Sequence, residues 1–117
     1  MATFSKQLLS GSTDGKAIKV AATATAGTLL HTAVTGTTNL DEIWLYAMNT
    51  STNNVKVTLE WGEATAPDGN IEVTVQAEAG LVCLTPGLLL QNSLVVRAFA
   101  ATANVITVHG FVNRITA

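Results

Sequence analysis

The chain has 117 residues, with six Lys and Arg against eight Asp and Glu, and a formal net charge of −2 at pH 7. Charged residues make up 12% of it, about half of the ~25% of an average soluble domain, whereas 48% of the residues are hydrophobic. The length suits one domain with its own core. The scattered basic residues argue against nucleic-acid binding, and no apolar run reaches the ~18 residues of a membrane-spanning helix.

So little charge leaves two interpretations of the surface. Either it is coated with Thr, Ser, Asn and Ala, or much of it is covered in an assembly. We favour the assembly, because a weakly charged surface promotes association. The first sixteen residues contain no apolar stretch typical of a signal peptide, so we expect a protein that stays in the cytosol unless it leaves inside a particle.

The chain begins with Ser, Gly, Thr and Asp placed around three hydrophobic side chains, Phe4, Leu8 and Leu9. This pattern predicts an N-terminal arm over residues 1–16 that buries the three side chains against a neighbouring molecule. We expect the remaining residues, 17–117, to form one domain, which begins with short strands at 17–21 and 28–34.

The stretch 40–62 predicts two strands joined by a turn, and it carries both tryptophans and the only tyrosine. Residues 43–48 form an unbroken apolar run, which favours a strand covered on both faces. Residues 49–54 are turn-formers, and residues 55–61 alternate between apolar and polar, as in a strand with one solvated face. We expect this hairpin to be the centre of the core.

The rest of the chain predicts more short strands, at 71–76, 80–84, 93–100 and 105–115, with Thr85-Pro86-Gly87 ending the second of them. Eight or nine strands, with turn signals every ~8–12 residues and no amphipathic helix, predict an all-β fold built as a single β-sandwich. A jelly roll is favoured because the strand count fits two four-stranded sheets. An immunoglobulin-like sandwich is the alternative, but a single cysteine cannot supply its usual disulfide.

No motif predicts catalysis, so we expect no enzyme and no catalytic, cofactor or metal site. Residues 11–16, GSTDGK, are one residue short of a phosphate loop, and Ala17 stands where Ser or Thr would bind magnesium. His31 and His109 have no third ligand at a metal-binding spacing. Cys83 lies in an apolar run, which predicts a buried and inert thiol.

Three further charged residues stand out. Glu60 and Glu72 lie on the solvated faces of two adjacent predicted strands, where we expect them to be exposed. Arg97 lies in an otherwise apolar strand and has two interpretations. It is either a side chain that reaches solvent from an edge strand, or an interface arginine that pairs with a carboxylate of a neighbouring subunit.

Five stretches of the chain together resemble a known family. They are LDEIWLYAMNT at 40–50, APD at 66–68 with IEV at 71–73, GLV at 80–82 with Pro86-Gly87, LVVRAFA at 94–100, and VHGFVNRI at 108–115. The chain resembles small virion proteins encoded among the structural genes of tailed bacteriophages and prophages, over nearly its full length from about Phe4.

The resemblance implies a capsid decoration (cement) protein, a β-sandwich that is often trimeric and lies over the joints between major capsid subunits. Its partners would be the major capsid protein and its own copies, most simply as a homotrimer, on the outer surface of the virion. No nucleic acid or membrane is implied. We expect the interface to include Phe4, Leu8, Leu9, Arg97, Phe99 and Phe111.

Two other functions stay open. One is another virion part, such as a head-fibre, neck or tail component. The other is a carbohydrate-binding β-sandwich, which would need exposed aromatic side chains. We expect Trp44, Tyr46 and Trp61 to lie in the core instead.

Overall fold

The computed structural model describes residues 2–117, which fold into nine strands without a helix. Within this range no helix is long and apolar enough to cross a bilayer. The strands are β1 (Thr3–Leu8), β2 (Ile18–Lys19), β3 (Thr28–Thr32), β4 (Leu40–Asn49), β5 (Val55–Trp61), β6 (Asn70–Val75), β7 (Val82–Leu90), β8 (Val95–Ala100) and β9 (Ile106–Thr116).

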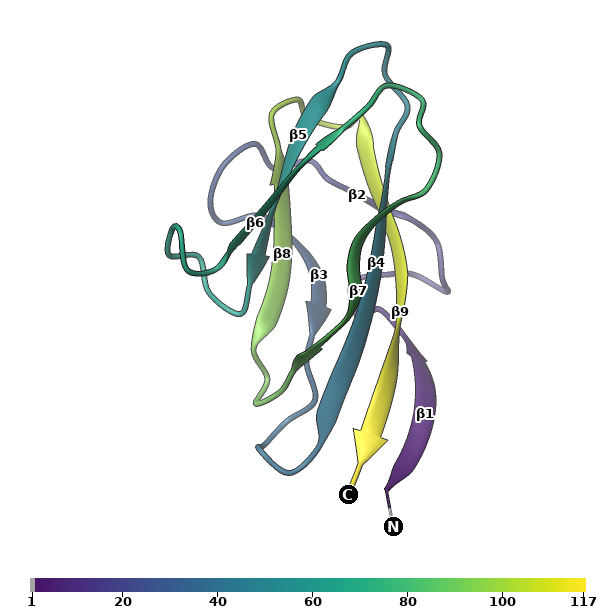
Figure 1. Ribbon diagram of the computed structural model, residues 1–117, viewed down its shortest axis with the longest axis vertical. Coiled ribbons are helices and arrows are strands. Elements are labelled where there is room, and N and C mark those ends of the chain that lie inside the picture. The colour runs from purple at the N-terminus through teal and green to yellow at the C-terminus, as the bar shows by residue number, and fades with distance from the viewer. Residues whose placement is uncertain (1) are drawn as a thin grey trace.

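The strands form two antiparallel sheets that pack together as a sandwich (Figure 1). Sheet A has the order β1-β9-β4-β7, and the short β2 pairs with β9 farther along the edge that β1 occupies. Sheet B has the order β3-β8-β5-β6. The all-β sandwich predicted from the sequence is therefore confirmed.

The strand pairing is that of a jelly roll. β1 and β2 pair with β9, β3 with β8, β4 with β7, and β5 with β6. The first half of the chain thus runs antiparallel to the second half, like one long hairpin that is rolled into two sheets. This order distinguishes the fold from the immunoglobulin-like alternative, in which strands pair in a different sequence.

The predicted hairpin over residues 40–62 is wrong in its pairing. β4 belongs to sheet A and β5 to sheet B, so the turn between them crosses from one sheet to the other. β4 alternates between buried and half-buried residues along its whole length. The inward residues Ile43, Leu45 and Ala47 enter the core, whereas Trp44 and Tyr46 lie on the outside of sheet A.

The first part of the predicted N-terminal arm is instead a strand of the domain. Residues 3–8 pair with Phe111–Thr116 of β9 without a register shift, which makes β1 an edge strand of the domain itself. The two ends of the chain therefore lie side by side, as Figure 1 shows. The Ser and Thr residues at the start of the chain favoured an arm outside the domain, but Thr3 and Ser5 belong to this edge strand.

The predicted break at Thr85-Pro86-Gly87 is also wrong, because β7 continues through it. β7 is an edge strand, and its register with β4 shifts twice, between Ile43 and Trp44 and between Leu45 and Tyr46. Proline is tolerated at edges and bulges because no ladder hydrogen bond is lost there. Gly87 accepts a φ of 82°, which lets the strand bend around the Trp44 ring.

The core between the sheets is entirely aliphatic. Its buried side chains are Leu, Ile, Val and Ala from both sheets, and no aromatic residue is among them. Trp61 packs against this cluster from one end and stays partly exposed. The aromatic residues are therefore available for other surfaces of the molecule.

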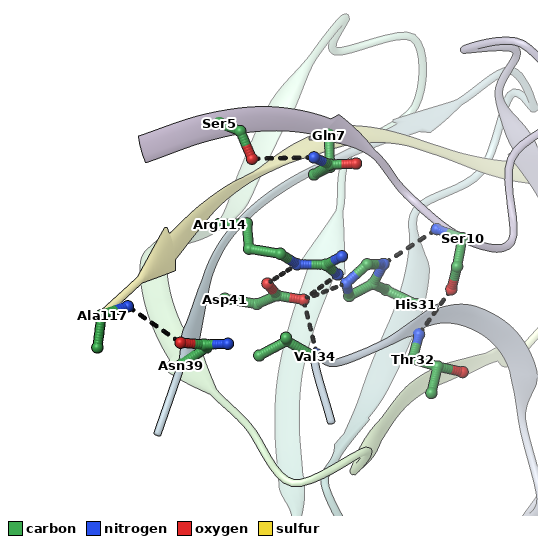
Figure 2. Close-up of polar contacts among 10 residues, drawn as sticks. All are labelled: Ser5, Gln7, Ser10, His31, Thr32, Val34, Asn39, Asp41, Arg114 and Ala117. Atoms are coloured by element: carbon green, nitrogen blue, oxygen red, sulfur yellow. Dashed lines mark hydrogen bonds and ion pairs between the residues drawn. The ribbon is translucent and has the colours of Figure 1, made fainter. Parts of the chain in front are cut away.

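One buried carboxylate joins the two sheets at the end of the sandwich near the chain termini (Figure 2). Asp41 of β4 is 0% exposed. Its Oδ1 accepts a hydrogen bond from Arg114 Nε at 2.8 Å, and its Oδ2 accepts from Arg114 Nη2 at 3.0 Å, His31 Nε2 at 2.8 Å and the Val34 backbone N–H at 3.0 Å. Since His31 belongs to β3 of sheet B and Arg114 to β9 of sheet A, Asp41 bridges the layers.

The same cluster holds the segment that follows β1. The backbone N–H of Ser10 donates to His31 Nδ1 at 3.0 Å, so this nitrogen carries no proton and the ring donates to Asp41 through Nε2. The Ser10 hydroxyl in turn accepts from the Thr32 backbone N–H at 2.7 Å. Both ring nitrogens of His31 are thus used, and the imidazole acts as a fixed link between Ser10 and Asp41.

Burial alone would raise the pKa of Asp41. The hydrogen bonds from Arg114 and His31 and the charge of Arg114 outweigh burial and lower the pKa of this carboxyl below its usual 3.8. The ionised form of Asp41 is therefore the form that stabilises the fold.

We predict that Asp41→Asn lowers the free energy of unfolding by about 3 kcal/mol, because it leaves the Arg114 guanidinium without its buried partner. Glu72→Gln is the matched control. It removes a carboxylate from the exposed pair between Lys56 Nζ and Glu72 Oε2, 2.9 Å apart, and should cost less than about 1 kcal/mol. Urea unfolding measures both, and equal costs would contradict the role given to Asp41.

Stability should also depend on pH through this group. Because the folded-state pKa of Asp41 is lowered, its contribution is fully present above the usual value of 3.8 and is lost as the pH falls through the folded-state pKa. We expect the free energy of unfolding of the wild type to fall between about pH 5 and about pH 3 more steeply than that of Asp41→Asn. Parallel curves would show that other carboxylates cause the acid sensitivity.

Candidate interaction surface

The outer face of sheet A, which points away from sheet B, is the candidate site. Strand side chains alternate between the two faces of a sheet, so every second residue of β4 faces outward. In register with them, the outward residues of β9 and β1 form rows that run across the strands. These outward residues are half-buried or exposed, because no segment within residues 2–117 covers them.

Two apolar rows flank one polar row on this face. The first apolar row is Phe4, Ile115 and Leu40, and the second contains Leu8, Phe111, Trp44 and Pro86. Between them lies the polar row of Lys6, Asn113 and Glu42, which ends at the exposed Leu89. We refer to these three rows, with Tyr46, Met48 and Cys83 beyond them, as the outer face.

Aromatic side chains gather on the outer face, which holds four of the six in the chain. The rings of Trp44 and Phe111 are stacked, with centroids 5.9 Å apart and planes 9° from parallel. The ammonium of Lys6 lies 4.8 Å from the centroid of the Phe111 ring, within the range of a cation–π contact. Large rigid aromatic groups at an accessible surface are typical of protein interfaces.

The polar row is internally connected. Glu42 Oε1 accepts hydrogen bonds from Trp44 Nε1 at 2.8 Å and from Asn113 Nδ2 at 3.0 Å. These bonds lower the pKa of the Glu42 carboxyl, with Asn113 contributing most. Glu42 therefore presents a fixed negative charge within the row, and it holds the Trp44 indole in one orientation.

Three of the six predicted interface residues meet on the outer face. Phe4 is 70% exposed and Leu8 56%, and both belong to β1. Leu8 lies directly opposite the half-buried Phe111 of β9. Phe4 and Leu8, which were assigned to an N-terminal arm, are thus presented by an edge strand.

The prediction for Leu9 is wrong, because this side chain is only 2% exposed and belongs to the core. It follows directly after β1, and the chain turns inward there, with Ser12 N–H donating to the Leu9 carbonyl at 3.0 Å. Gly110 leaves the space that Leu9 fills, since a Cβ at Gly110 would lie 3.2 Å from Leu9 Cδ1.

Arg97 and Phe99 lie elsewhere, on the outer side of sheet B, so the six predicted residues do not form one surface. β8 is an interior strand between β3 and β5, which rules out the edge-strand interpretation of Arg97. Its Nη1 donates to the Gly27 carbonyl at 3.2 Å, and the side chain is half-buried. Pairing of Arg97 with a subunit carboxylate stays a prediction.

The predictions that Glu60 is exposed and that Cys83 is buried are both wrong. Glu60 is 1% exposed, because the segment before β3 covers it: Thr25 Oγ1 and the Gly27 N–H donate to its two oxygens at 2.8 and 2.6 Å. Cys83 is exposed on the outer face, opposite Tyr46 in the β7–β4 register. In contrast, Glu72 is exposed as expected.

Trp44 and Tyr46 are the surface residues that sequence reasoning missed. In the run from Ile43 to Met48 both alternate positions are apolar, so the period of two does not show which face is inward. The residues before the run do not settle the question either. Asp41 and Glu42 are both acidic, yet Asp41 is buried and Glu42 lies on the outer face. The one signal in the sequence was the unbroken apolar run itself. A strand that is apolar on both faces needs another surface packed against each face.

The titratable and nucleophilic side chains show no metal-binding or triad-like arrangement among the described residues. Among residues 2–117, no cluster of three or more His, Cys, Asp and Glu side chains is placed to hold a metal ion. Ser10, His31 and Asp41 are close together, but the Ser10 hydroxyl accepts from Thr32 and does not contact the imidazole. This arrangement lacks the hydroxyl-to-imidazole hydrogen bond of a catalytic triad.

Comparisons of the chain with protein-family models, with curated proteins and with solved structures found no match.

The adjacent residues Leu8 and Leu9 provide a test of the placement of Leu8 on the surface and Leu9 in the core. We predict that Leu9→Ala lowers the free energy of unfolding by about 2–4 kcal/mol, because it opens a cavity in the core. Leu8→Ala should change it by less than about 1 kcal/mol, because the side chain is already in solvent. Chemical denaturation of the two variants measures the difference, and a larger loss for Leu8→Ala would contradict the placement of β1.

Proposed function

We propose that the protein is a capsid decoration (cement) protein of a tailed-phage virion, which binds the assembled head at the joints between major capsid subunits. The observation that carries the proposal is the uncovered outer face of sheet A. In that role the face contacts the shell, and the rest of the sandwich serves as its rigid support.

The composition of the outer face suits this role. A monomer rarely leaves a broad aromatic and aliphatic surface uncovered, and such surfaces mark interaction sites. The polar row between the apolar rows adds directional contacts, which fix the position of a partner more than they add affinity. With a formal net charge of −2, the chain has little long-range repulsion to overcome when many copies crowd on one particle.

The size of the molecule is also sufficient. A standard interface buries about 800 Å² on each partner, roughly one-eighth of the 6087 Å² that this chain exposes. Since each copy on a shell would bridge neighbouring subunits, many modest contacts act together against outward pressure.

The fold is compatible with the proposal without deciding it. Jelly rolls are common in viral capsid and lectin domains, but one fold serves many functions. A head-fibre, neck or tail component would use the same surface, and its position on the particle distinguishes these roles.

The carbohydrate-binding alternative gains from the outward position of Trp44 and Tyr46. However, a sugar site needs several free hydrogen-bonding groups around its aromatic platform. Here the polar groups next to Trp44 are Glu42 and Asn113, which bond to each other through Glu42 Oε1, and the Lys6 ammonium lies over the Phe111 ring. Most of the other neighbours are apolar. The surface therefore favours a protein partner.

We predict that the purified protein co-sediments with undecorated heads of its own phage, and that Leu8→Glu weakens this binding at least tenfold. The new carboxylate would be buried against an apolar partner without a counter-charge. Leu29→Glu is the matched control, because Leu29 is an exposed leucine of sheet B, and this variant should bind like the wild type.

Two outcomes would contradict the proposal. One is the absence of wild-type protein from sedimented heads, and the other is equal loss of binding in Leu8→Glu and Leu29→Glu. Circular dichroism of both variants checks that they are folded before the comparison is made.

A further inference from the structure

The two sheets have four edges in the described part of the chain, one of them shared by β1 and the two-residue β2. On the other three edges the edge strand carries features that block pairing with another chain. β7 contains Pro86 and two register shifts. β3 is five residues long and has a register shift between Leu29 and His31. β6 presents the charged pair of Glu72 with Lys56. Prolines, bulges, short length and charges are the usual means by which edge strands avoid association.

β1 is the exception. It runs for six residues in continuous register with β9, without a proline or a bulge. Its one charged side chain, Lys6, lies over the Phe111 ring on the sheet face. Half of the residues of an edge strand direct their N–H and C=O groups away from the sheet, so β1 offers a row of unpaired backbone groups. Figure 1 shows β1 at the outside of sheet A.

We propose that β1 pairs antiparallel with β1 of a second copy, about a two-fold axis that passes through Ser5 perpendicular to sheet A. The two five-stranded sheets then join into one continuous sheet of twice the width. A perpendicular two-fold axis keeps each face on its own side, so the two outer faces become one surface. The dimer therefore satisfies the free edge and leaves the outer face, apart from the flanks of Phe4 and Leu8 beside the edge, available for another partner.

The register follows from the side-chain pattern. Residues opposite each other in a sheet point to the same face, so Phe4, Lys6 and Leu8 of one copy must lie opposite even-numbered residues of the other. An axis through Lys6 would place the two Lys6 side chains opposite each other, which is unfavourable. An axis through Ser5 places Lys6 opposite Phe4 and Leu8 opposite Ala2 of the second copy, and it allows the longest pairing.

A second copy is the occupant that fits this edge. An isologous contact needs a self-complementary strand, and the Ser5-centred pairing matches polar Thr3 with Gln7 and apolar Ala2 with Leu8. The formal net charge of −2 per chain gives little repulsion between copies. The exposed Phe4 and Leu8 beside the edge extend the contact beyond the backbone hydrogen bonds. The two-fold pair differs from the trimer that the family resemblance implies, and it does not depend on capsid binding.

Sedimentation velocity of the wild type over a range of concentrations tests the proposal. We expect a reversible monomer–dimer equilibrium. Ser5→Lys should weaken it at least tenfold, since it places two lysines opposite each other at the axis. Thr32→Lys adds the same charge to the exposed end of the β3 edge and should leave the equilibrium unchanged. Wild-type protein that stays monomeric at all concentrations, or that forms a trimer, would overturn the proposal.

A second measurement tests the register directly. In a Cys83→Ser background, Ser5→Cys should form a disulfide-linked dimer with oxidised glutathione, because Ser5 lies opposite itself at the axis. Thr32→Cys in the same background should stay monomeric. If Ser5→Cys and Thr32→Cys cross-link equally, the contact is random collision and the β1 pairing is wrong. Unfolding midpoints close to that of the parent show that the variants are folded.

Discussion

The arrangement of the whole molecule depends on the buried Asp41 carboxylate and its partners. Asp41 accepts from Arg114, His31 and the Val34 backbone, so it joins β4 and β9 of one sheet to β3 of the other. His31 passes the constraint to Ser10, which fixes the chain directly after β1. An ionised group so far from solvent is tolerated only when every oxygen is hydrogen-bonded, which makes this end of the sandwich specific in its geometry.

This constraint has a consequence for the surface. With the end of β1 held beside His31, Leu9 enters the core over Gly110, and Leu8 one residue earlier must point outward. Phe4 and Leu8 therefore stand in register with Ile115 and Phe111. Because the core is filled by aliphatic side chains, most aromatic residues lie on a rigid sheet. In the proposed role this preorganises them for the partner and reduces the entropy lost on binding.

The sequence predicted the fold class, since the alternation in residues 55–61 and 71–76 and the turn residues between strands are local signals. It failed where tertiary context decides. The bulge between Leu29 and His31 lets the consecutive residues Leu30 and His31 both face inward. The regular alternation of a strand would place them on opposite faces. Leu8 and Leu9 are chemically identical, so the sequence does not show that the turn after β1 and the space beside Gly110 place Leu9 in the core and leave Leu8 on the surface. The run from Ile43 to Met48 did predict a strand that needs cover on both faces, although the described residues of the chain cover only the inner face.

The central claim is that the outer face of sheet A is the surface that contacts a shell. A cryo-electron-microscopy reconstruction of phage heads carrying this protein, at a resolution that separates the strands, measures this directly. The account predicts a sandwich over the joints between capsid subunits, with Phe4, Leu8, Trp44 and Phe111 against the shell. A sandwich that contacts the shell through sheet B, with this aromatic surface in solvent, would contradict it.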